Sequence, residues 1–156
     1  MDNRILALAV TVFVALLPAA AQTPASATAD VMAVVRQFVD GFNKGDMKVL
    51  SSTCADQAAI IDEFPPHAWL GTGACAKWSS DFDADARKNG ITDAVVTLGK
   101  PLHVDATPDR AYVVVPADYA YKQKGKPVKE IGSILTIALQ KSAAGWRITG
   151  WSWAKH

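Results

Sequence analysis

The stretch FNKGDMKVLSSTCADQAAIIDEF, from Phe42 to Phe64, carries the signals that decide the fold. Gly45 is typical of a helix end, and Asp46 directly after it is a good N-cap for a second, short helix. The β-prone residues that follow, Ala58 to Asp62, predict a short strand. A long helix, a short helix and a strand that ends in a carboxylate therefore begin the domain.

The residues on either side of this stretch predict two further helices and a brief strand. Upstream, apolar residues recur at helical spacing and predict an amphipathic helix with Thr28 as its N-cap. Downstream, Trp69 and Leu70 favour a brief strand, and a helix is expected over residues 74–89 with Gly90 just past its end. The apolar face of the first helix consists of Val31, Val34, Val35, Phe38, Val39 and Phe42.

From Asp93 onward the pattern changes to long strands separated by turn residues. Helices early in the chain and antiparallel strands late in it predict an α+β fold, in which a curved antiparallel sheet packs against three N-terminal helices. Glycine and proline inside the strands indicate strong bending, and a bent sheet over helices encloses a cone-shaped cavity. The expected strands are Val95 to Val104, Arg110 to Lys124, Val128 to Lys141 and Trp146 to Lys155.

Strict alternation along these strands predicts which side chains share a face. The strand from Arg110 to Lys124 is expected to carry on one face Val113, Val115, Ala117, Tyr119 and Tyr121. Trp151 and Trp153 are expected on one face of the last strand, and Trp146 on the other.

The first 21 residues have the pattern of a secretory signal peptide. Arg4 precedes the apolar run Ile5 to Leu17, and small residues up to Ala21 form a cleavage site. An uncleaved anchor stays open because Asp2 is unusual in such a leader. Cleavage after Ala21 would leave a flexible lead-in over 22–28 and a single domain over 29–156, secreted or periplasmic, with no stable membrane insertion.

Charge and cysteine content restrict the remaining possibilities. The net charge is +1 and there is no basic stripe, so nucleic acid is not an expected partner. Export would place the only two cysteines, Cys54 and Cys75, in an oxidising compartment, which favours a disulfide. The alternative is two buried free thiols.

The ordered set of elements resembles the SnoaL-like, ketosteroid-isomerase-like branch of the nuclear transport factor 2-like superfamily. The features that carry the resemblance are the turn Gly45–Asp46, the pair Ala55–Asp56, the acid-terminated strand, and Gly145 to Ile148 in the last hairpin. It covers about Ala29 to Trp153. It implies a cone with an apolar cavity and a homodimer that forms through the outer face of the sheet.

When the site residues of the family are matched to this sequence one by one, the resemblance implies only part of an isomerase site. Asp62 falls where ketosteroid isomerase has its catalytic base. That enzyme also needs an oxyanion hole, which is made by a tyrosine and a protonated aspartic acid. The positions of those two donors hold Phe38 and the apolar segment Leu135 to Ile137. The isomerase mechanism of that type is therefore not expected here.

The candidate site residues are an acid, a histidine and a group of aromatics. Asp62 could be a general base in the cone with His67 as its partner, or an ordinary solvated strand end. Asp62, His67 and His103 lack the spacing of a metal site, so no metal and no cofactor are expected. The aromatic residues could line a ligand cavity or form plain core: Phe38, Trp69, Trp78, Phe82, Tyr119, Trp151 and Trp153.

Three functions remain open at this point. The first is binding of a small, largely apolar molecule in the cone. The second is an isomerase, lyase or hydratase with Asp62 as general base, which would need Trp or Tyr donors as the electrophile. The third is a homodimeric interaction module whose cone is filled by its own side chains.

Overall fold

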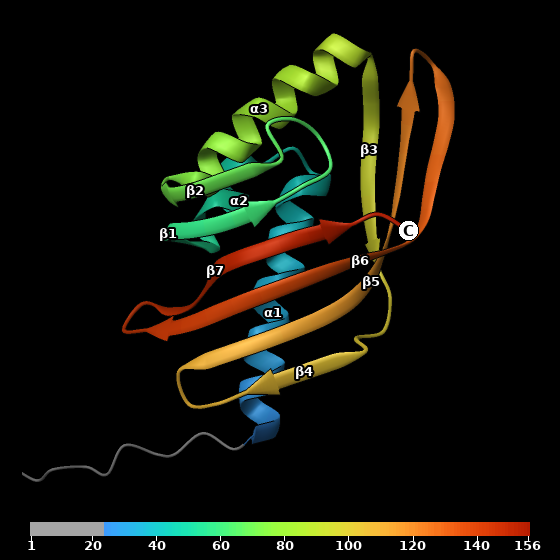
Figure 1. The fold of residues 1–156 in the computed structure, drawn as a ribbon. Coiled ribbons are helices and arrows are strands. Elements are labelled where there is room, and N and C mark those ends of the chain that lie inside the picture. Colours follow the sequence, from blue (N-terminus) through green and yellow to red (C-terminus); the bar gives the residue numbers. More distant parts are fainter. Residues whose placement is uncertain (1–23) are drawn as a thin grey trace, which may run out of the picture.

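The structure is a computed structural model that describes residues 24–156, so the predicted signal peptide lies outside the described residues. Three helices precede the long strands, as the sequence predicts (Figure 1). Within the described part of the chain, no helix is long and apolar enough to span a membrane. The elements are α1 (Pro24–Asn43), α2 (Met47–Ser52), β1 (Cys54–Ile61), β2 (Ala68–Thr72), α3 (Ala74–Asn89), β3 (Ile91–Leu98), β4 (His103–Ala106), β5 (Arg110–Gln123), β6 (Lys126–Ser142) and β7 (Gly145–Ala154).

Helix α1 begins earlier than the sequence predicts. It starts at Pro24, a residue type that suits the first helical position because its missing N–H would have no helical partner there. Residues 24–28 are therefore helical rather than a flexible lead-in, and Thr28 lies inside the helix rather than at its N-cap. The predicted apolar face is confirmed, since Val31 and Val35 are fully buried.

The turn between α1 and α2 forms as the stretch around Gly45 predicts. The side chain of Asp46 accepts a hydrogen bond of 2.9 Å from the backbone N–H of Val49 and caps α2. The two helices approach closely, because a Cβ on Gly41 would lie only 2.8 Å from the backbone nitrogen of Leu50. Gly41 is thus the residue that allows this packing.

The sheet has the strand order β2-β1-β7-β6-β5-β3, with β4 paired to β5. All neighbouring pairs are antiparallel except β1 and β7, which run parallel, so the sheet is mixed rather than wholly antiparallel. The single strand expected from Val95 to Val104 is two strands, β3 and β4. Pro101 lies in the break between them, where its missing N–H costs no ladder hydrogen bond.

A bulge in β6 changes which of its side chains face inward. Ala117 pairs with Ser133 but Tyr119 pairs with Glu130, so two residues of β6 lie opposite Asp118. Gly132 has φ +82° and donates its backbone N–H to the Asp118 carboxylate at 3.0 Å. The extra residue turns Ile131 outward, where it is 62% exposed, and brings Glu130 to the inner face beside Tyr119.

A second bulge, at Thr149 in β7, corrects the predicted place of Trp146. Ile148 pairs with Leu139 and Gly150 with Ala138, so Thr149 is the additional residue. The inward face therefore changes parity at this point. Trp146 is 4% exposed and belongs to the same buried core as Trp151, and not to the opposite face.

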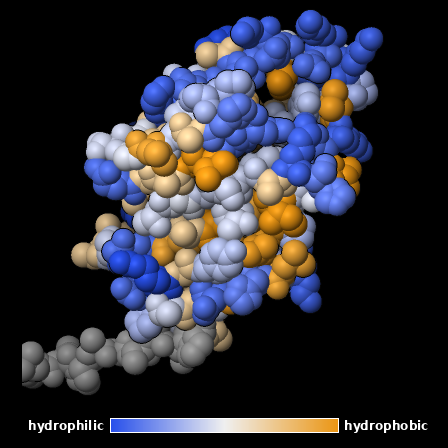
Figure 2. Space-filling view, in the orientation of Figure 1, coloured by the Kyte–Doolittle hydropathy of each residue, from blue (hydrophilic) through white to orange (hydrophobic). Residues whose placement is uncertain are grey.

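The helices cover the concave side of the sheet, and the core lies between them. Helix α1 packs against β3, β4 and β7, while α3 packs against β1 and β2 (Figure 1). The face of the sheet that points away from α1 carries apolar patches among pale and polar residues (Figure 2). Tyr112 on β5 is one exposed apolar residue, at 46%. Homodimerisation through the outer face stays a prediction.

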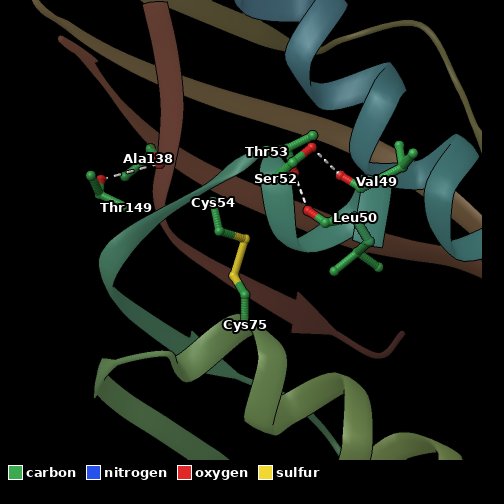
Figure 3. The surroundings of a disulfide bond; sticks show 8 residues. All are labelled: Val49, Leu50, Ser52, Thr53, Cys54, Cys75, Ala138 and Thr149. Carbon is green, nitrogen blue, oxygen red and sulfur yellow. Dashed lines mark hydrogen bonds between the residues drawn. A yellow bond between two sulfur atoms is a disulfide. The ribbon is translucent and has the colours of Figure 1, made fainter. Parts of the chain in front are cut away.

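The expected disulfide is present, and free thiols are not. Cys54 at the start of β1 is bonded to Cys75 in the first turn of α3, as Figure 3 shows. The two Cα atoms are 6.5 Å apart, within the usual range for a disulfide. The bond ties α3 to the strand that carries Asp62 beyond its other end.

Candidate functional site

A cavity of about 270 Å³ lies between α1, α3 and the inner face of the sheet. The volume is slightly below the range of about 300–1,000 Å³ typical of small-molecule pockets, and the lining is largely apolar. The cone is thus not filled by its own side chains, which contradicts that part of the third alternative. Seven of the predicted site residues line the cavity: Phe38, Asp62, Trp78, Phe82, Tyr119, Trp151 and Trp153.

The aromatic lining is a connected set of rings. The Trp78 ring is 4.8 Å from Trp151, centroid to centroid, and 5.6 Å from Phe82. Phe42, in the last turn of α1, lines the cavity and contacts both Phe82 and Tyr119. Rings at these separations hold one another in place, so the apolar wall is largely preformed.

Asp62 is a half-buried carboxylate at the end of β1, and it lines the cavity. Its Oδ2 accepts a 2.7 Å hydrogen bond from Nε1 of Trp78, and its Oδ1 accepts one of 2.7 Å from the backbone N–H of Glu63. Burial raises the pKa of this carboxyl from 3.8 to about 6, although both hydrogen bonds lower it. Asp62 is thus an acid whose proton can move near neutral pH.

Two predicted site residues lie elsewhere. The ring of His67 is exposed, and its Nδ1 is 3.3 Å from the backbone carbonyl oxygen of Asp62 rather than from the carboxylate. Trp69 is buried behind the cavity, where it donates to Oδ2 of Asp81 at 2.8 Å and packs on Phe64. Neither side chain lines the cavity, so His67 is not brought beside the Asp62 carboxylate.

A charged cluster at the cavity was missed by sequence reasoning. Glu130 accepts hydrogen bonds from Lys155 Nζ at 2.8 Å and from the Tyr121 hydroxyl at 3.2 Å, both on its Oε1. Lys155 also pairs with Glu63 at 3.0 Å. Strict alternation puts Glu130 on the outside, and only a bulge at Gly132 brings it in. A glycine inside a strand is the one signal that could have indicated this.

Three of the residues that line the cavity each have a buried polar atom without a hydrogen-bond partner among residues 24–156. These atoms are the hydroxyl of Tyr119, Nε1 of Trp151 and Oε2 of Glu130. Burial holds the pKa of Tyr119 above its ordinary value, so its hydroxyl stays protonated and can donate. Buried polar groups are rarely left without partners, and those at ligand sites find them in the ligand.

The cavity does not contain the oxyanion hole of a ketosteroid isomerase at the positions that the resemblance assigns. Phe38 and Leu135 both line the cavity, and neither side chain can donate a hydrogen bond. The available donors come instead from β5 and β7, as Tyr119 and Trp151. Among the described residues, no group of three His, Cys, Asp or Glu side chains is placed to hold a metal ion.

The curved mixed sheet, the three helices that precede its long strands and the cavity between them define an α+β cone. The SnoaL-like domain family matches residues 31–152, and the chain belongs to this family. No curated protein matches the chain in sequence.

Solved structures share the fold. A nuclear transport factor 2-like protein with a cystatin-like fold from Novosphingobium aromaticivorans has a TM-score of 0.68 at 15% identity, covering 84% of this chain and 82% of its own. A ketosteroid isomerase-like protein from Erwinia carotovora atroseptica has a TM-score of 0.62 at 19% identity, covering 82% and 95%. A nuclear transport factor 2 superfamily protein from Salmonella enterica has a TM-score of 0.72 at 11% identity, covering 85% and 93%. At these identities the likeness is one of fold, which does not define an activity.

Proposed function

We propose that the protein binds a small, largely aromatic or apolar molecule in the cone, with a polar group of that molecule at the Asp62 end. The observation that carries this proposal is the aromatic cavity, three of whose lining residues each have an unpartnered buried polar atom. The apolar rings would supply contact area, and the polar atoms would orient the ligand. The signal-peptide pattern and the disulfide support a secreted or periplasmic location for this binding.

Binding can be measured through the tryptophans of the cavity wall. We expect acetophenone and 2-phenylethanol, which each combine one ring with one polar group, to change tryptophan fluorescence in a saturable way. Trp78, Trp151 and Trp153 would report the occupied cavity.

Two neighbouring valines of β3 provide a matched pair of variants for this titration. Val96 lines the cavity, whereas Val95 is 43% exposed and does not. Val96→Phe should fill the cavity and weaken binding at least tenfold, and Val95→Phe should leave it unchanged. Equal affinities in the two variants, or no saturable response to any small aromatic compound, would contradict binding in the cone.

Asp62 also favours a second function, proton-transfer catalysis on the bound molecule. A general base works best when its pKa lies near the operating pH, and the pKa of Asp62 is raised to about 6. The Tyr119 hydroxyl and Trp151 Nε1 are unpartnered donors that could stabilise a developing oxyanion. In the same binding experiment, conversion of the compound that stops in Asp62→Asn while binding persists would distinguish an enzyme from a binding protein.

A further inference from the structure

The charged side chains that line the cavity are mostly negative. Asp62, Glu63, Asp85 and Glu130 contribute carboxylates, and Lys155 contributes the ammonium group. Lys155 is already engaged by two of these acids, at 2.8 Å from Glu130 and 3.0 Å from Glu63. Within residues 24–156, one cation therefore lines the cavity with four carboxylates, and the excess of negative charge lies beside a wall of aromatic rings.

Glu130 provides the observation that points to a ligand. Its side chain is only 9% exposed, and one oxygen takes both of its hydrogen bonds, from Lys155 and Tyr121. The other oxygen, Oε2, is buried and accepts none within the described chain. A buried carboxylate oxygen without a donor is costly, and a donor brought by a ligand would remove that cost.

Asp62 also lacks a positively charged partner among the described residues. Its two hydrogen bonds come from neutral donors, the indole of Trp78 and a backbone amide. The charges of Glu63 and Glu130 lie close enough to disfavour its ionisation. Within the part of the chain that the structure describes, no cationic side chain therefore hydrogen-bonds to this carboxylate or forms an ion pair with it.

We infer that the ligand of the cone carries a protonated primary amine, held between the carboxylates of Asp62 and Glu130. This inference rests on the proposed function and names the chemical class of its ligand. The rings of Tyr119 and Trp153, whose centroids are 6.2 Å apart, add faces over which a cation is attracted. An ammonium N–H would give Glu130 Oε2 a charge-assisted hydrogen bond.

Three probes that share one ring and one chain length test the charge alone. They are 2-phenylethylamine, which is protonated at neutral pH, the neutral 2-phenylethanol and the anionic phenylacetate. Dissociation constants from tryptophan fluorescence should favour the amine over the alcohol by about tenfold, with phenylacetate weakest. Equal binding of amine and alcohol would overturn the cationic class and leave the proposed function standing. The absence of binding by all three would overturn both.

Two variants that change the charge in opposite directions make the test sharper. Glu130→Gln should weaken binding of the amine about tenfold, and Lys155→Gln should strengthen it severalfold by freeing Glu130 and Glu63. The matched control is Asp105→Asn, an exposed side chain on β4, which should change nothing. Lys155 is half-exposed, so we expect Lys155→Gln to fold. Its affinity for the amine can then be measured even if Glu130→Gln folds poorly. The site would instead be assigned to anions by two results together. Phenylacetate would bind the wild type most tightly of the three probes, and it would no longer bind Lys155→Gln.

Discussion

Loss of the Cys54–Cys75 disulfide should lower the melting temperature of the protein by about 10 °C. The bond joins residues 21 positions apart, and closing a loop of this length is worth about 3 kcal/mol in the chain-entropy description. A change of 1 kcal/mol shifts the melting temperature of a domain of this size by roughly 3–6 °C. The measurement is thermal unfolding of the oxidised protein, the reduced protein and the double variant Cys54→Ala with Cys75→Ala.

The double variant is also the control for the reducing agent, because its own unfolding should not respond to it. Cys75 is 3% exposed, so alanine is preferable to serine, which would bury an additional hydroxyl. The same melting temperature in all three samples, together with two thiols that can be alkylated in the native protein, would contradict the disulfide.

Asp62→Asn should make the protein more stable at pH 7, by about 3 kcal/mol. The pKa of Asp62 is raised from 3.8 to about 6, mainly by burial, and a pKa difference of one corresponds to about 1.4 kcal/mol. At neutral pH the folded protein therefore carries a carboxylate that costs free energy. Asparagine removes the charge, and its side-chain oxygen can still accept the hydrogen bond from Trp78.

The pH dependence of the stability difference between wild type and Asp62→Asn identifies the cause of that difference. Between pH 3.8 and about 6 the folded protein binds more protons at Asp62 than the unfolded chain, so the Asp62 contribution to stability falls as the pH rises. Urea unfolding of wild type and Asp62→Asn should give equal stabilities near pH 3.5 and the full difference above pH 6.5. The exposed Asp105→Asn should show no such divergence. A less stable Asp62→Asn at pH 7 would mean that its hydrogen bonds outweigh the cost of burial.

Local signals in the sequence were sufficient for the helices and most of the strands. The bounds of α3 and the Asp46 cap of α2 agree with the sequence prediction, because both depend on residues within one or two turns. The start of α1 was placed too late, since Thr28 looks like a cap but Pro24 is a stronger first residue. The parallel pairing of β1 with β7 was also missed, because strand direction depends on partners distant in sequence.

The candidate site was predicted for its aromatic wall and for Asp62, and not for its other charged residues. Phe38, Trp78 and Tyr119 follow simple periodicity, and they line the cavity as expected. Trp146 is misplaced, and Glu130 is not predicted at all, because each lies beyond a bulge, where counting by twos along a strand fails. The hydrogen bond between Asp62 and Trp78 joins two elements whose relative position no local pattern defines.

The bulge at Gly132 allows the residue that faces into the cone to change while the surrounding strands stay the same. One residue more or less in β6 decides whether the acid at 130 or the isoleucine at 131 points into the cone. The buried segment from Ser133 onward lies beyond the bulge and pairs with β5 and β7. We expect it to keep that pairing in either case. Insertions and deletions at this point could therefore change a ligand's required charge in one evolutionary step, while the scaffold that supports the site persists.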